Sequence, residues 1–458
     1  MPRVPAVASA RTQPAITEEF AGVSFGRGNS AQDTVRQVPE LPLACETPLC
    51  AAGRQMYVVI VSFLWVALIT PSVAAQIPPG SASSLSVSGP TFDEGSVQRI
   101  REALATYLEI ESRGGWPALP QKASLTPGAK TAMVSQLRRR LVLSGDLAAD
   151  KEKGDLFDAD VTDAVRGFQR RHGLVPNGAV GLQTLRALNV PASKRVLQLR
   201  GSLHRLSGTD FTFARRYVVV NLPAASVEAI ANGKVEGRYV AVVGHTKHAS
   251  PTLTSGINQI IVNPTWTVPL SIVKNEIVPR MRRDPRYLAR MHMRVLAGKD
   301  EVSPRSIAWS SVRSPNFMIR QDSGTWNALG AVKIDMPNSH AVYMHDTNNK
   351  NAFDAQYRFL SHGCTRVQNV RELAAWLLSD VPGWTRSDLD AAIAKEDRLE
   401  IKLPRRVPVA WIYLTGWKTN DGEVQFRDDI YDLDASDVAS VRGKLRPANK
   451  PGSYLDAR

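Results

Sequence analysis

Residues 343–367 carry the pattern from which the fold and the chemistry of this chain are inferred. The chain reads Tyr343-Met-His345-Asp-Thr, and fifteen residues separate His345 from the second part, Ser361-His362-Gly363-Cys364-Thr365-Arg366-Val367. Residues 341–344 are typical of a strand, so His345 can face Cys364 from a neighbouring strand. A nucleophilic cysteine needs such an imidazole, because a thiol with a pKa of about 8.5 is only a few per cent ionised near neutral pH.

Gly363 directly precedes the thiol, and a glycine there lets the backbone approach a substrate closely. The N–H groups of Gly363 and Cys364 can hold the oxyanion of an acyl-transfer reaction. A metal site built from His340, His345, His362 and Cys364 has suitable ligand types, but it lacks the compact ligand spacing of zinc sites. The pattern therefore favours a cysteine nucleophile that works without a metal or an organic cofactor.

The segments around this pattern indicate a β-rich domain. Residues 217–222, 238–243 and 257–262 are β-branched runs bounded by Gly, Asn or Pro, which predicts strands. Residues 409–417 and 423–426 are expected to form a hairpin. Residues 271–295 are instead helical and basic, which indicates either a solvated helix face or a lid over an anionic substrate.

A separate helical unit precedes the strands. Apolar residues spaced by three and four predict a helix over 97–108 and three short helices over 134–141, 161–168 and 182–188. Asp158 or Asp160 can cap the second of the three. Three small helices give a thin core that holds little chemistry, so we expect this unit to bind rather than to catalyse.

The composition excludes several classes of protein. With 43% hydrophobic and 22% charged residues, the chain is globular and is not disordered, collagen-like or a polytopic membrane protein. Its formal charge is +14, and residues 76–458 hold the whole excess, which suits an anionic polymer as partner. Nucleic acid is not expected, because none of the usual binding motifs is present.

The N-terminal part predicts export. Residues 57–69 are thirteen uncharged residues, a run that is short for a membrane span and typical of a signal peptide. We expect cleavage before Gln76 or retention as a membrane anchor. The expected N-terminal boundaries are 1–55 for an extension that is disordered or precedes the true start of translation, 56–75 for the signal peptide or anchor, and 76–92 for a linker. A helical scaffold segment is expected at 93–128 and the three-helix unit at 129–192. The β-rich domain is expected at 193–432, with its lid at about 271–336, and a flexible tail at 433–458.

These residues resemble two known families. The histidine, its spacing and the Ser-His-Gly-Cys motif resemble the YkuD-type catalytic domain of L,D-transpeptidases, and residues 262–269, 327–330, 337–340 and 426–431 are similar to its long Gram-negative branch. Residues 168–188 resemble the three-helix peptidoglycan-binding module. The resemblance implies an α+β fold, with a mainly β catalytic domain, an inserted helical lid and a small all-α peptidoglycan-binding domain.

The resemblance also implies the roles of the site residues. Cys364 would be the nucleophile, and His345 would be the general base that later acts as the acid. The Gly363 and Cys364 N–H groups, aided by the Tyr343 hydroxyl, would hold the oxyanion. Further contacts to the substrate would come from Ser361, His362, Arg366, Trp266 and Asn327. The group that orients the His345 ring is left open, because in this family a backbone carbonyl often serves.

The implied reaction is a two-step acyl transfer on peptidoglycan stem peptides in the periplasm. The cysteine would expel D-alanine from a tetrapeptide stem and form a thioester, and an amine of a neighbouring stem would resolve it as a 3→3 cross-link. Three alternatives stay open: an L,D-carboxypeptidase, an enzyme that attaches proteins to the wall, and a non-catalytic peptidoglycan-binding scaffold. The sequence does not indicate an oligomeric state.

Overall fold

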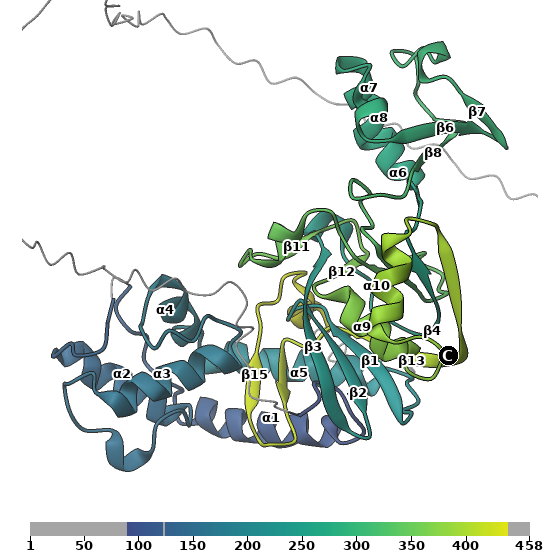
Figure 1. The fold of residues 1–458 in the computed structure, drawn as a ribbon. Coiled ribbons are helices and arrows are strands. Elements are labelled where there is room, and N and C mark those ends of the chain that lie inside the picture. The colour runs from purple at the N-terminus through teal and green to yellow at the C-terminus, as the bar shows by residue number, and fades with distance from the viewer. Residues whose placement is uncertain (1–88, 122–123, 438–458) are drawn as a thin grey trace, which may run out of the picture. The chain divides into compact units, whose positions relative to one another are not determined.

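The computed structural model describes residues 89–121 and 124–437 (Figure 1). The predictions for the N-terminal extension, for the signal peptide or anchor, for most of the linker and for most of the tail lie outside these residues. Within the described part of the chain, no helix is long and apolar enough to cross a membrane.

The three-helix unit forms as predicted. It consists of α2 (Ala132–Leu143), α3 (Ala159–Arg171) and α4 (Leu182–Leu188), with a short 3-10 turn η1 (Ala149–Lys151) between the first two. Its helices enclose one apolar core that includes Leu137 and Phe168. Asp158 is the residue that caps α3, because its carboxylate accepts a hydrogen bond from the Val161 N–H at 3.1 Å.

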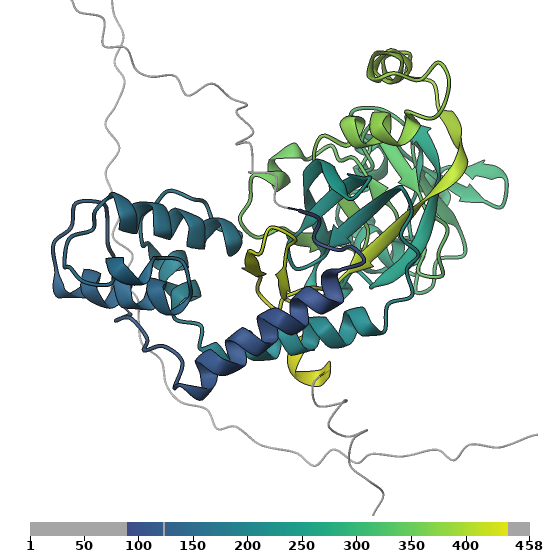
Figure 2. The ribbon, with the colours of Figure 1, turned by 90° about the horizontal axis from the view of Figure 1, so that it is seen from below.

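Two longer helices pack on the β-rich domain. The predicted helix is α1 (Ser96–Ser112), and α5 (Ala192–Ser207), which the sequence did not predict, lies beside it (Figure 2). The two helices share an apolar core with the strands, formed by residues such as Ile100 and Leu199. The sequence predicts no helix here, because the buried face of α5 also includes Arg195 and other polar residues. These polar residues weaken the apolar periodicity.

The β-rich domain is built on a nine-stranded sheet in the order β11-β3-β12-β10-β9-β4-β13-β1-β2. Because β3 also pairs with β2, the sheet closes on itself. The strands are β1 (Arg216–Asn221), β2 (Ser226–Ala231), β3 (Lys234–Gly244), β4 (Leu253–Val262), β9 (Val332–Asp335), β10 (Met344–His345), β11 (Phe359–Ser361), β12 (Thr365–Val367) and β13 (Leu399–Ile412). The short turns η2 (Thr246–His248) and η5 (Lys350–Phe353) and the helices α9 (Val370–Leu378) and α10 (Arg386–Ala394) complete the domain. The three predicted strands are present as β1, β3 and β4.

The predicted C-terminal hairpin is wrong in its first arm. Residues 409–412 are the end of β13, which runs between β4 and β1, with Val409 opposite both Ser255 and Val218. The hairpin is smaller and consists of β14 (Gly416–Lys418) and β15 (Val424–Phe426). An apolar run in the sequence does not indicate whether the strand pairs with the next strand or with one far away in the chain. Here β13 pairs with two distant strands, β1 and β4.

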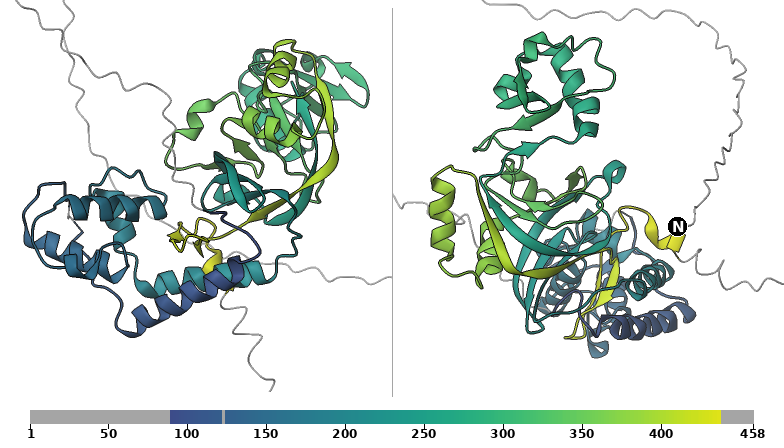
Figure 3. Two further views of the ribbon diagram at one scale, coloured as in Figure 1. Left: turned by 60° about the horizontal axis from the view of Figure 1, so that its bottom comes forward. Right: turned by 90° about the vertical axis from the view of Figure 1, so that its right-hand side faces the viewer.

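Residues 266–321 leave the main sheet between β4 and β9, and we call them the inserted subdomain (Figure 3). Its helical part comprises α6 (Leu270–Ile272), a π-helical turn η3 (Val273–Ile277), α7 (Val278–Arg283), α8 (Tyr287–Arg290) and a turn η4 (Pro304–Ser306). Its strands, in the order β5-β8-β6-β7, are Trp266–Thr267, Met318–Gln321, Met293–Ala297 and Asp300–Val302. The subdomain has its own apolar core.

The predicted lid at 271–336 therefore needs two corrections. It is not wholly helical, because it contains strands of a four-stranded sheet, and it ends earlier, because 332–335 is β9 of the main sheet. Strands of two to five residues carry too little alternation to be recognised from sequence.

Candidate active site

The parallel pairing of β10 with β12 brings the two halves of the sequence motif together. Met344 lies opposite Thr365, and His345 lies opposite Arg366. Because paired residues project to the same face, His345 and Arg366 share one face. Cys364 directly precedes β12, two residues before Arg366, and its side chain interacts with Tyr343, which directly precedes β10.

The His345 ring is oriented by the backbone. Its Nδ1 forms a hydrogen bond with the carbonyl oxygen of Asp346. Since a carbonyl oxygen only accepts, Nδ1 carries the proton and Nε2 keeps a free lone pair. The Asp346 carboxylate does not serve this purpose, because it accepts the Ala331 N–H at 3.0 Å and contacts the Lys350 ammonium.

Burial determines the protonation states of the two candidate catalytic groups. It lowers the pKa of His345 to about 3, and the nearby positive charge of Arg366 acts in the same direction. Burial also raises the pKa of the Cys364 thiol. The resting pair is therefore a neutral thiol and a neutral imidazole, so proton transfer has to accompany the attack of the sulfur rather than precede it.

Tyr343 contacts the cysteine directly. Its main chain and its hydroxyl both form hydrogen bonds with the Cys364 side chain, and the hydroxyl also bonds with Trp266. Trp266 belongs to β5, the first strand of the inserted subdomain. Tyr343 therefore connects the sulfur with the start of the subdomain.

Hydrogen bonds within residues 361–364 stabilise the turn before Cys364. Gly363 has a φ of +111°, a backbone conformation that other residues rarely adopt. Its N–H donates to Ser361 Oγ at 3.2 Å, and Ser361 Oγ donates to the Cys364 carbonyl oxygen at 2.5 Å. The Gly363 N–H is thus already bonded in this structure, and Ser361 braces the turn. The carbonyl oxygen of Gly363 accepts from Ser250 Oγ at 2.7 Å.

His362 is directed away from this face, toward the inserted subdomain. Its Nε2 lies 2.7 Å from Glu276 Oε1, and its ring stacks on His248 with centroids 4.7 Å apart. The side chains of His362 and Glu276 are 40% and 39% exposed. His362 is therefore a contact between the motif and the inserted subdomain.

Comparisons with known proteins identify two regions of the chain. Residues 215–396 match the family described as "L,D-transpeptidase catalytic domain". The chain contains an L,D-transpeptidase catalytic domain. Residues 130–188 match the family described as "Putative peptidoglycan binding domain", so the three-helix unit is a peptidoglycan-binding domain.

Individual relatives cover only parts of the chain. A protein of Haemophilus influenzae described as "Putative L,D-transpeptidase" is 31% identical over 219 residues, which are 47% of this chain and 44% of the relative. The solved L,D-transpeptidase of Xylanimonas cellulosilytica is 16% identical, with 64% of this chain and 98% of that chain covered and a TM-score of 0.19. That of Stackebrandtia nassauensis is 12% identical, with 65% and 96% covered and a TM-score of 0.25.

Two further predicted residues of the transpeptidase domain have different environments. Asn327 is fully buried, and its side-chain amide donates to the carbonyls of Pro264 and Asp322 while its oxygen accepts the Leu329 N–H. These bonds use its polar atoms within the chain, so Asn327 braces the base of the inserted subdomain, and its contact with a substrate stays a prediction. Arg366 instead has a buried Nε without a partner among the described residues.

The sequence missed four residues that support the transpeptidase site. Lys333 Nζ lies 4.3 Å from the Tyr343 ring centroid, and its charge lowers the pKa of Cys364. Ser250, Glu276 and His248 contact motif residues as described above. No local pattern marks these positions, since each lies on an element far from the motif in sequence. Among the described residues, no group of three or more His, Cys, Asp or Glu side chains could hold a metal ion.

Proposed function

We propose that this chain is a peptidoglycan L,D-transpeptidase that forms 3→3 cross-links through a thioester on Cys364. The observation that carries the proposal is the parallel register of β10 and β12, which pairs His345 with Arg366, two residues after Cys364. The match of residues 215–396 to the L,D-transpeptidase catalytic domain supports the class of reaction. The peptidoglycan-binding domain supports the substrate.

The first half-reaction releases D-alanine. As Cys364 Sγ attacks the carbonyl between residue three of the stem and the terminal D-alanine, its proton passes to His345 Nε2. The Tyr343 hydroxyl and the Cys364 N–H are the donors left to stabilise the oxyanion, because the Gly363 N–H is already bonded. When the tetrahedral intermediate collapses, the proton on Nε2 passes to the departing amine, and a thioester remains.

The second half-reaction forms the cross-link. An amine of a neighbouring stem attacks the thioester and gives a proton to His345 Nε2, and the Cys364 thiol leaves with that proton. Water competes for the same thioester, so the site has to exclude it. The inserted subdomain suits this purpose, because Trp266 and Glu276 connect it with both sides of the motif.

The proposal places the protein in the periplasm, where its substrate lies, with export through residues 56–75. The positive charge of the chain favours carboxylate-rich stems as donor and acceptor. Secretion of an alkaline phosphatase fused after residue 92 would support export, whereas a cytoplasmic inactive fusion would contradict it.

The decisive experiment compares the full chain with Cys364→Ala. After incubation with a tetrapeptide muropeptide, the intact mass of the unsubstituted chain should increase by an acyl group on Cys364, and the Cys364→Ala mass should not change. Cross-linked dimers among the products support transfer, and tripeptides alone would favour the carboxypeptidase alternative. If Cys364→Ala still remodels isolated sacculi, the proposed chemistry is wrong, whereas retained sacculus binding is expected.

A further inference from the structure

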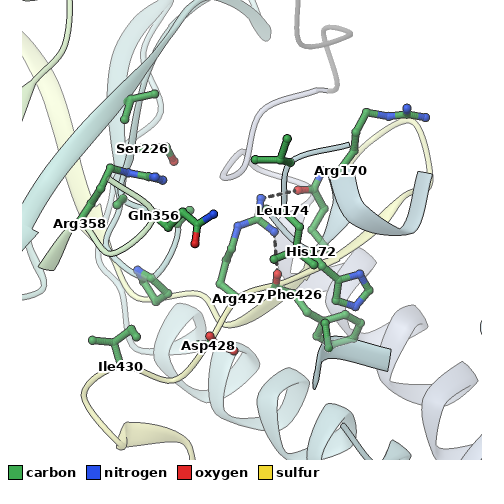
Figure 4. Close-up of a pocket in the computed structure, with 18 of the residues that line it drawn as sticks. Arg170, His172, Leu174, Ser226, Gln356, Arg358, Phe426, Arg427, Asp428 and Ile430 are labelled. Carbon is green, nitrogen blue, oxygen red and sulfur yellow. Dashed lines mark hydrogen bonds between the residues drawn. The ribbon is translucent and has the colours of Figure 1, made fainter. Parts of the chain in front are cut away.

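A second cavity lies apart from the cysteine. It has a volume of about 720 Å³ and is lined by the peptidoglycan-binding domain, by β3, by the segment before β11 and by the β14–β15 hairpin (Figure 4). Neither Cys364 nor His345 lines it. Its volume falls within the range of about 300–1,000 Å³ typical of ligand sites.

The charged lining of this cavity has an excess of arginine. The arginines are Arg170, Arg186, Arg195, Arg238, Arg358 and Arg427, and the carboxylates are Glu228, Asp354, Glu423 and Asp428. Glu228 is already paired with Arg238 at 2.9 Å. Burial raises the pKa of Glu423. Positive charge therefore dominates the remaining lining.

Of the six arginines, only Arg238 forms a salt bridge with a carboxylate of the described residues, and Arg195, Arg358 and Arg427 are the at least partly buried ones among the other five. Arg427 donates to the carbonyl oxygens of Arg171 and Phe426 at 2.9 and 2.7 Å. Arg195 donates to the Ala187 carbonyl and the Gln198 side chain. Burial lowers the pKa of both to about 10. A buried charge without a counter-charge is costly, and an anionic ligand would relieve that cost.

Arg358 has the least satisfied side chain of the three. It donates one hydrogen bond, to the Ala355 carbonyl at 3.1 Å, and its buried Nε has no partner among the described residues. In the view of Figure 4, Gln356 lies between Arg358 and Arg427. Arginine and amide side chains that line one cavity can bind a carboxylate together with a neighbouring peptide group.

We infer that this cavity is a second binding site, which takes a carboxylate-bearing peptide such as an uncross-linked peptidoglycan stem. The identity of the ligand rests on the proposed function, and the cavity and its charges do not. The lining also offers the Asp428 carboxylate for an amine. A peptide that carries both carboxylates and an amine fits the arginines and the Asp428 carboxylate of the lining better than a phosphate does, because a phosphate has neither an amide nor an amine.

The test uses the full chain and a synthetic tetrapeptide stem that carries a photoactivatable diazirine. After irradiation, mass spectrometry of the digested protein should find label on residues 354–358 or 425–428, separately from any label near Cys364. The same peptide with its carboxylates converted to carboxamides should label the cavity about tenfold less, since it loses charge-assisted hydrogen bonds.

A matched pair of variants tests the arginines. Arg358→Met should reduce the labelling of the cavity about tenfold without lowering the melting temperature, because it removes an unpartnered buried N–H group. Arg101→Gln, at an exposed position of α1, should leave the labelling unchanged. The amidated peptide needs no variant, so it decides the outcome even if Arg358→Met is unstable.

Two results would overturn the inference: labelling of the cavity that neither amidation nor Arg358→Met reduces, or the absence of labelling there. Protection by inorganic phosphate that equals protection by the unlabelled tetrapeptide would indicate a small-anion site and would also refute it. Labelling of the cavity without an acyl adduct on Cys364 would refute the proposed reaction and keep the second site, so the two proposals fail separately.

Discussion

At the scale of single residues, the active site depends on which hydrogen-bonding groups are already in use. The Asp346 carbonyl oxygen accepts a hydrogen bond from Nδ1 of His345, and Ser361 Oγ accepts one from the Gly363 N–H. One nitrogen of His345 therefore remains as a base, and the oxyanion donors are reduced to the Cys364 N–H and the Tyr343 hydroxyl. Burial then keeps both the imidazole and the thiol neutral.

The pH dependence of acylation follows from these states. Since the pKa of His345 is lowered to about 3, its imidazole stays neutral as the pH falls through the usual histidine range near 6.5. The rate of thioester formation should change less than about twofold between pH 8 and pH 5 and should fall only near the lowered pKa. Rapid-quench mass spectrometry of the acyl-enzyme at each pH measures this rate.

His345→Gln serves as the reference for this profile and should show almost no acylation at any of these pH values. A tenfold loss of rate between pH 7 and pH 5.5 in the unsubstituted chain would contradict the neutral resting pair, because it would indicate a histidine that titrates at its ordinary pKa.

At the scale of elements, the inserted subdomain meets the motif through few contacts. Its own core is separate from that of the main sheet. Trp266 bonds with Tyr343 where the subdomain begins, and Glu276 of η3 contacts His362. Because His362 and Glu276 are partly exposed, their contact contributes little stability, about 1 kcal/mol at most. Such a contact can open during turnover.

Loosening this contact should favour water over the acceptor amine. Glu276→Gln should raise the ratio of hydrolysed tripeptide to cross-linked dimer by no more than about fivefold, with the melting temperature nearly unchanged. Chromatography of the muropeptide products measures the ratio. Glu301→Gln is the matched control, because Glu301 pairs with Arg294 at 3.5 Å inside the same subdomain. Equal ratios for both variants would mean that the Glu276 contact does not restrict access of water.

At the scale of the whole molecule, one apolar core joins the α1 and α5 helices to the sheet. Leu199 of α5 is fully buried among residues that include Val219 of β1 and Ile412 of β13. The helices therefore stabilise the strands that form the closed sheet. They do not contribute a side chain to the catalytic face.

Removing the Leu199 side chain should weaken the described chain as a unit. Leu199→Ala should lower the free energy of unfolding by about 2–5 kcal/mol, as a cavity forms in a packed core. Leu182→Ala on α4, where the side chain is 60% exposed, should cost less than about 0.5 kcal/mol. Urea unfolding followed by tryptophan fluorescence compares the two, and equal costs would show that α5 is not coupled to the sheet.

The sequence by itself determined the class of fold, the peptidoglycan-binding helices, three of the strands and the residues of the motif, because these depend on local periodicity and on fixed spacing. Cys364 and His345 could be named for the same reason. Only the tertiary structure decided that β13 is a central strand, that the inserted subdomain contains a four-stranded sheet, and that Asn327 and the Gly363 N–H are already bonded. It also brought Glu276, Ser250 and Lys333 to the motif and six arginines to a cavity apart from it. These features arise from contacts between residues that are far apart in the chain. A local sequence pattern does not indicate which distant segment will bond with a polar group, or whether a buried charge will find a partner.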